Sequence, residues 1–233
     1  MKNIFNIAVI IFALLPPFLS GCTITYDKLA AENRLEKVIL DDISSKPNII
    51  KTPLKVALFC DMETMNSPEE FVKSWNWNMG DKKLVISYLE NLEELGYISE
   101  YYVIPHNLGS SMQDINHLIN EARKMDADVL ITLRGIIKVN RYFNPVAILD
   151  LTLLGACLFP GSNCDAILLA HMDMWNVKDR DCILTVTADG IKRISEPTFL
   201  IEPDDAVSPV MRETLRKVLA EFKKRCREIK PAK

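Results

Sequence analysis

The sequence predicts an α/β protein with one mixed five-stranded sheet and helices packed on it. First, five segments of strand length are rich in β-branched and apolar residues, and the segment 128–139 (DVLITLRGIIKV) alternates over its whole length. Second, three segments repeat apolar residues at helical spacing. Third, the elements follow the order β-α-β-α-β-β-β-α. Each β-α-β step implies parallel neighbours, and the final hairpin adds antiparallel strands.

The first half of the predicted domain contains the first β-α-β step. A near-continuous apolar strand at 54–60 has the pattern of a strand covered on both faces, and a second strand is predicted at 98–104. The helix between them begins at Asp81, carries a wide apolar face and ends at Gly96. We therefore expect the two strands to lie parallel.

The second helix and the remaining strands follow. Ser111 and Asp114 have the spacing of a capping box, which opens a helix leading directly into the strand at 128–139. In that strand, alternate apolar side chains from Val129 onward share one side of the sheet. Strands at 166–177 and 181–188 then form a hairpin across a short polar turn.

A final helix is predicted to start near Ser208, with Pro209 at its first position. Its carboxyl end carries the basic run KKRCR, which complements the helix dipole and needs no ligand to explain it. The chain has 28 Lys and Arg against 31 Asp and Glu, a net charge of −3, and no other basic cluster. This balance disfavours a nucleic-acid partner.

An apolar insertion at about 143–165 separates the third strand from the hairpin. Its centre, 146–159, has fourteen residues and is polar only at Asp150 and Thr152. That is too short for a membrane-spanning helix and about the length of one or two short strands, in which Asp150 and Thr152 would share a face with Leu154. Three interpretations stay open: burial in the fold, which we favour, a contact surface for a partner or another copy, and insertion into the membrane. The residues expected to make such a contact are Leu151, Leu153, Leu154 and Phe159.

The first residues have the pattern of a secretion signal. Lys2 precedes a 15-residue apolar stretch at 4–18, which is shorter than a membrane span. Leu19, Ser20, Gly21 and Cys22 follow and resemble a bacterial lipobox, which implies signal-peptidase recognition of the first three residues and lipidation of Cys22.

The lipobox resemblance defines three regions: a signal peptide at 1–21, a lipidated tether with a short helical stretch at 22–52, and a single α/β domain at 53–233. Thr23 follows the cysteine, where an Asp would resemble an inner-membrane retention signal. We therefore expect a lipid-anchored protein of the bacterial cell envelope, on the outer membrane and facing the periplasm.

Five further cysteines lie in the domain. Cys157 and Cys164 are close enough in sequence to form a disulfide, and an oxidising envelope would permit it. The alternative is that all five are small buried apolar residues, and the sequence leaves both interpretations open.

Two segments resemble a family of bacterial envelope modules. The residues ADVLITLRG at 127–135 match a helix end followed by an apolar strand and a glycine, and MWNVKDRD at 174–181 occupies the place of a hairpin motif, departing from it at Asn176 and Arg180. The family includes the curli-secretion lipoprotein, the lipoprotein activator of penicillin-binding proteins and the amino-terminal domain of TolB. The resemblance implies fold and compartment. More weakly, the insertion resembles small lipoproteins associated with rhomboid-type sorting systems.

Catalytic motifs are largely missing from the sequence. His171 and Asp173 share a strand face, which indicates a hydrogen-bonded pair on the helix-free side of the sheet more than two metal ligands. Asp61 and Glu63 follow the first strand, where α/β proteins place ligands, but no nucleophile or glycine-rich anion loop accompanies them. No cofactor or metal is indicated.

Trp75 and Trp77 lie in a long loop, where they either anchor a partner or pack into the core. The sequence as a whole predicts a non-enzymatic, lipid-anchored interaction or assembly module with a protein partner in the envelope or with itself. The alternatives are a subunit of an outer-membrane secretion channel, and an enzyme using the acids and the histidine named above.

Overall fold

The computed structural model describes residues 52–65, 79–105 and 114–228. The predicted leader, the lipidation site Cys22, the tether as far as residue 51, and both Trp75 and Trp77 lie outside the described residues.

One mixed sheet organises the chain, with the strand order β2-β1-β3-β4-β5. Its strands are β1 (Leu54–Met65), β2 (Ile98–Val103), β3 (Val129–Phe143), β4 (Ser162–Asn176) and β5 (Cys182–Glu196). β1 runs parallel to both β2 and β3, and β3, β4 and β5 are antiparallel to one another. The predicted α/β class and mixed five-stranded sheet are confirmed. The second β-α-β step does not give neighbouring strands as predicted, because β3 pairs with β1 and not with β2.

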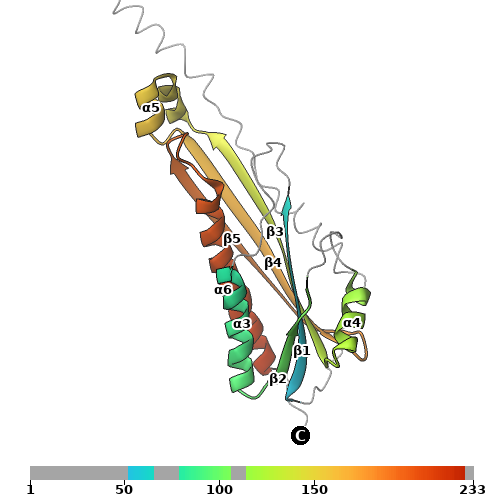
Figure 1. Cartoon of the computed structure of the whole chain (residues 1–233). Coiled ribbons are helices and arrows are strands. Elements are labelled where there is room, and N and C mark those ends of the chain that lie inside the picture. The colour runs from blue at the N-terminus through green and yellow to red at the C-terminus, as the bar shows by residue number, and fades with distance from the viewer. Residues whose placement is uncertain (1–51, 66–78, 106–113, 229–233) are drawn as a thin grey trace, which may run out of the picture.

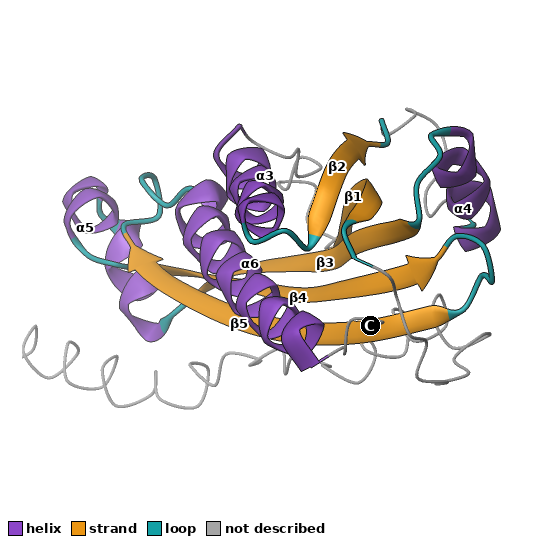
Figure 2. Ribbon diagram, turned by 90° about the horizontal axis from the view of Figure 1, so that it is seen from below, coloured by secondary structure: helices purple, strands orange, loops and turns teal. Residues whose placement is uncertain are grey.

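Three helices cover the sheet and two short ones cap its long hairpin (Figures 1 and 2). The covering helices are α3 (Met79–Glu94), α4 (Ile115–Lys124) and α6 (Pro203–Glu228). α3 and α6 lie on one face, here called the α6 face, and α4 lies on the opposite α4 face. A 3₁₀ helix, η3 (Pro145–Leu151), and helix α5 (Leu153–Leu158) connect β3 to β4.

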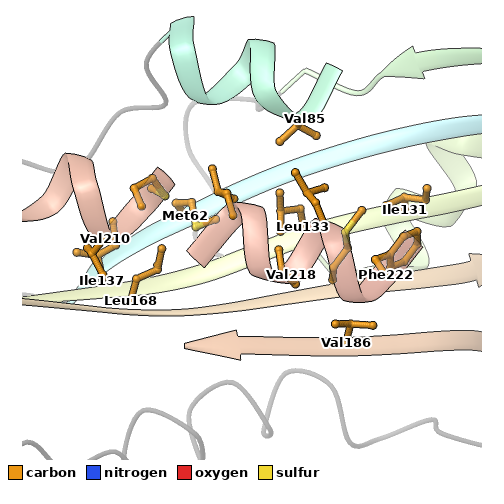
Figure 3. Packing of buried hydrophobic residues seen from close by; sticks show 14 of the residues in the cluster. Met62, Val85, Ile131, Leu133, Ile137, Leu168, Val186, Val210, Val218 and Phe222 are labelled. Carbon is orange, nitrogen blue, oxygen red and sulfur yellow. The ribbon is translucent and has the colours of Figure 1, made fainter. Parts of the chain in front are cut away.

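The main core lies between the sheet and helices α3 and α6 (Figure 3). Alternate residues of β3 point into it, as their spacing predicts, and Ile131, Leu133 and Ile137 are almost fully buried there. α6 lies so close to β5 at Gly190 that an added Cβ there would overlap the Thr214 hydroxyl. This burial of apolar surface is the dominant stabilising contribution to the fold.

A smaller core on the α4 face holds one end of the sheet. Phe59, Leu130 and Trp175 are buried against Leu118 and Ile119 of α4. This core lies at the end of the sheet at which β3 begins, and α4 does not extend over the rest of the α4 face.

Several predicted boundaries are wrong, mostly because backbone pairing continues past the apolar pattern. β3 and β4 pair without interruption as far as Phe143 and Ser162, well beyond the predicted limits of these strands at residues 139 and 166. β1 continues to Met65, so the acids expected in a loop lie within the strand.

Two helix starts also differ from the prediction. The side chain of Asp114 caps α4 and accepts a hydrogen bond from the Asn116 amide, while Ser111 lies outside the described residues. Pro203 takes the first position of α6, and Pro209 lies inside the helix.

Candidate contact surface at the hairpin tip

The β3–β4 connection is helical, not the one or two short strands that its composition predicted. Asn144 starts η3 by accepting a hydrogen bond from the Val146 amide, with Pro145 at the first position. Thr152 caps α5 through a hydrogen bond from the Gly155 amide at 2.9 Å. The apolar composition of this connection is compatible with helix or strand, and the capping hydrogen bonds favour the helices.

The described side chains of this connection are largely exposed, so the favoured interpretation, burial within the fold, is wrong for them. Leu151, Leu154 and Leu158 expose 87%, 73% and 67% of their surfaces. Among the described side chains of this connection, Ala156 is the one apolar side chain that is buried. Asp150, Thr152 and Leu154 share no strand face, because the backbone is helical. The side chain of Leu153 lies outside the described residues. The exposed apolar residues form what we call the tip patch: Val146, Ile148, Leu149, Leu151, Leu154, Leu158 and Phe159, with Phe143 beside them.

A polar tie fixes the tip to the body of the domain. The Thr198 hydroxyl, in the turn between β5 and α6, donates to the Asp150 carboxylate at 2.5 Å and lies 2.8 Å from the Ser162 hydroxyl. The Arg141 guanidinium donates to the Thr198 carbonyl. An added Cβ at Gly161 would lie 2.7 Å from an Asp150 oxygen, so that glycine permits the close approach. The tie holds η3 in one position although η3 buries none of its residues.

The same turn extends the apolar surface. Phe199 and Leu200 follow Thr198 directly and expose more than half of their surfaces. Because Thr198 contacts Asp150, these two side chains lie at the same end of the molecule as α5. Two segments distant in sequence therefore form one exposed apolar end. Soluble monomers seldom expose a contiguous apolar patch of this kind without a function for it.

Charges are kept behind the tip. Between residues 145 and 161 the only charged residue is Asp150. On the α4 face behind the tip, the Arg193 guanidinium holds the Asp165 carboxylate through two hydrogen bonds of 2.7 and 2.8 Å, and this pairing raises the pKa of Arg193. The arrangement, an apolar centre with a polar surround, is the usual anatomy of a protein interface.

The tip and the start of the domain lie at opposite ends of the sheet. β1 begins at Leu54, near the first residues of β3, and β3 then runs 15 residues to Phe143 beside the tip. At 3.3–3.4 Å per residue, these ends are about 50 Å apart. Any segment attached before Leu54 therefore joins the domain far from the tip patch (Figure 1).

The Cys157–Cys164 disulfide, one of the two interpretations that the sequence left open, is not formed, because both residues are free thiols. Cys157 is exposed on α5, whereas Cys164 lies in β4 and is buried on the α6 face. Burial raises the pKa of the Cys164 thiol to about 11. The alternation of β4 turns one sulfur into the core while α5 keeps the other at the surface.

The predicted His171–Asp173 pair is confirmed as a buried polar pair, but the face that holds it is not free of helices as predicted, because α4 covers one end of it. His171 Nε2 lies 2.8 Å from Asp173 Oδ1, and His171 Nδ1 lies 2.9 Å from the Thr187 hydroxyl. The hydroxyls of Thr185 and Thr132 donate to the two Asp173 oxygens at 2.7 and 3.3 Å. With these partners the carboxylate is engaged on both oxygens, so the group joins β3, β4 and β5 as a structural network.

Arg134, which sequence reasoning missed, belongs to the same region. It pairs in register with Asp61 of β1 on one side and with His171 on the other. Burial lowers the pKa of Arg134, while the charges of Asp173 and Asp61 oppose that change. In the sequence, the one sign of this was that Arg134 lies at an even-numbered position of β3, on the face opposite to the alternating apolar side chains that start at Val129. The side chain of Glu63 lies outside the described residues, and Asp61 lies within β1.

Two further properties concern the described part of the chain alone. Across 52–65, 79–105 and 114–228, no three His, Cys, Asp or Glu side chains are grouped to hold a metal ion. None of the helices in those ranges is both long and apolar enough to cross a membrane.

Comparison with known proteins finds similar folds and no sequence relatives. No family model and no curated protein matches the chain. A neuraminyllactose-binding hemagglutinin homolog from Helicobacter pylori is similar with a TM-score of 0.43 and 15% identity, over 78% of this chain and 89% of that one. The C-terminal domain of LpoB from Salmonella enterica (TM-score 0.32, 11% identity, 71% and 98% covered) and lipoprotein GNA1162 from Neisseria meningitidis (0.33, 9%, 74% and 99%) are also similar.

Proposed function

We propose that this protein is a lipid-anchored, non-enzymatic interaction module of the bacterial envelope that docks onto a protein partner through its tip patch. The observation that carries the proposal is the exposed apolar end formed by α5, η3 and the Thr198–Leu200 turn. An exposed apolar surface of this kind, surrounded by polar groups and held by a specific tie, has the form of a docking site.

The position of the tip supports a partner away from the anchoring membrane. If Cys22 carries the lipid, the tether joins the domain at the end opposite the tip, 30 residues after the anchor. Fully extended, 30 residues span at most about 100 Å, and the tip adds about 50 Å beyond the attachment point. The tether would therefore set how far from the membrane the domain can extend, and the tip patch would contact the partner.

A protein partner fits the shape of the tip better than a second tip does. Short helices at the end of a long hairpin project from the body (Figure 1), so two copies meeting end to end would cover little of each other. A groove on a partner can receive the leucines of α5, as grooves receive the apolar side of other helices. Self-association is then an outcome of the test below and would correct the choice of partner.

Lipid anchoring is tested with a Cys22→Ser substitution. We expect the variant to fold with an unchanged melting temperature and to move from the membrane fraction to the soluble fraction, because the thiol that takes the lipid is gone. A Cys157→Ser variant is the matched control and should stay with the membrane. A Cys22→Ser protein that still pellets with membranes after an alkaline wash would refute the lipid anchor.

Docking is tested by cross-linking from the tip itself. Cys157 is an exposed thiol on α5 and can carry a short photo-activatable cross-linker. We expect a defined adduct in native membranes that disappears when Leu154 and Leu158 are both replaced by Asp. The control places the same cross-linker at Val103→Cys in a Cys157→Ser background, at an exposed site on β2. An adduct that survives the double substitution would contradict the proposed contact surface, and an adduct that is a dimer of this chain would correct the choice of partner.

A further inference from the structure

An apolar cavity of about 180 Å³ lies on the α6 face, at the end of the sheet opposite the tip patch. Thirteen residues line it, and none of them is charged. Its walls come from the first residues of β1, β2 and β3, from Met174 of β4, from the end of α3 and the turn after it, and from the last turns of α6. Phe222 and Ile131, labelled in Figure 3, are part of this lining and are almost fully buried.

The walls of the cavity are held in place by contacts between the two helices. The rings of Tyr88 and Phe222 meet edge to face, with centroids 6.4 Å apart and planes at 72°. The Lys223 ammonium donates to the Asn91 side-chain oxygen and so joins α6 to α3. Gly96 ends the α3 turn with a φ of +75°, and an added Cβ there would meet no atom within 4 Å. The contacts between α3 and α6 therefore hold the two helices that wall the cavity beside this turn.

The chemistry of the lining favours an apolar occupant over water. A buried water needs two to four polar partners, and a cavity of about 150 Å³ lined by Leu, Ile and Phe stays dry and binds benzene-sized ligands. Here the polar groups of the lining are the hydroxyls of Thr52 and Tyr97 and the thiol of Cys226. Burial raises the pKa of that thiol to about 12.

The mouth of the cavity lies where the remainder of the chain joins the domain. Thr52 and Leu95 belong to the lining and are exposed. Cys22 precedes Thr52 by 30 residues, a separation that a chain can span up to about 100 Å. A lipid on Cys22 is therefore within reach of the opening, as is a lipid of a membrane near this end of the domain.

We propose that this cavity binds a single alkyl chain of a lipid. A cavity of this size accommodates on the order of six or more carbons of the alkyl chain, as the comparison with benzene-sized ligands indicates. The rest of the alkyl chain and the lipid head group would extend past Thr52 and Leu95 into solvent. The two sources of such a chain are the protein's own lipid on Cys22 and a separate membrane lipid or fatty acid. The site does not depend on the tip patch, and substitutions in α5 leave it unchanged.

The test uses two matched valine substitutions in the full chain carrying Cys22→Ser. Val129 and Val186 are both buried in strands on the α6 face, but only Val129 lines the cavity. Val129→Phe should fill the cavity, keep the melting temperature within a few degrees and weaken binding of the fluorescent fatty acid cis-parinaric acid at least tenfold. Val186→Phe should lower the melting temperature, because packed cores resist larger side chains, while its folded form still binds the probe.

Three results would overturn the proposal: no binding of the fatty acid to the Cys22→Ser protein, equal binding by the Val129→Phe variant, or a loss of stability in Val129→Phe as large as in Val186→Phe. The source of the chain is separated by repeating the titration with the lipidated protein in detergent. Binding that is blocked by lipidation and restored by Cys22→Ser assigns the cavity to the protein's own lipid. Equal binding by both forms assigns it to a separate lipid.

Discussion

Replacing both Leu154 and Leu158 with Asp should leave the domain folded and abolish docking. The two side chains are one turn apart on α5 and expose 73% and 67% of their surfaces. Neither loses a core contact when it becomes polar, and the lower helix propensity of Asp costs at most about 0.7 kcal/mol for each substitution. We expect the melting temperature to fall by no more than about 6 °C.

The effect on docking follows from the apolar area that a partner would cover. Full burial of a leucine side chain contributes about 1.5–3 kcal/mol. Scaled by the exposed fractions, the two leucines together contribute about 2–4 kcal/mol, which weakens binding about 30- to 1000-fold when it is lost. Two carboxylates placed in an apolar groove add a desolvation cost, so the measured loss should lie at the upper end or beyond.

The assay combines thermal unfolding with the cross-linking yield from Cys157 in the same membranes. Val103→Asp serves as the control, because Val103 is an exposed apolar residue on the edge strand β2, in a different segment from the tip. A double variant that melts more than about 10 °C below the parent would show that α5 is packed within the fold, since this exceeds the shift expected from surface changes. A stable variant with undiminished cross-linking would show that the partner binds elsewhere.

Two further predictions test the tie and the thiols. Asp150→Ala removes the carboxylate that accepts from Thr198 and should destabilise the domain by about 1.5–3 kcal/mol in urea unfolding, the usual contribution of a hydrogen bond to a charged group; an unchanged midpoint would show that the tie contributes nothing. Maleimide at pH 8 should modify exposed Cys157 in the native Cys22→Ser protein and leave Cys226 unmodified until unfolding, because burial raises the pKa of Cys226 to about 12. Peptide mass spectrometry distinguishes the two sites, and rapid native labelling of Cys226 would contradict its burial.

The directions of the strands could be predicted because they follow from short-range patterns, whereas the order β2-β1-β3-β4-β5 was not predicted. Alternation along β3 assigns each side chain to a face whatever its neighbours are, and each β-α-β step allows one sense of pairing. The His171–Asp173 pair was predictable for the same reason, since residues two apart in a strand point the same way. The apolar faces of α3, α4 and α6 follow from helical spacing in the same manner.

Element ends were harder to predict, because they depend on which strand lies alongside. β4 begins at Ser162, in polar residues that resemble a loop, because the backbone of β3 continues to offer partners as far as Phe143. Arg134 shows the same dependence: its burial makes sense only once Asp61 and His171 flank it in neighbouring strands.

By itself, the sequence determined the fold class and the faces of the strands, and the lipobox at Cys22 stays a prediction from the sequence. Only the tertiary structure decided that the apolar connection after β3 is helical and exposed, and that the Thr198 turn joins it across 48 residues. The physical reason is that composition states how apolar a segment is, while its burial depends on what other segments lie against it. At this tip no described helix does, so the leucines that composition placed in the core remain at the surface.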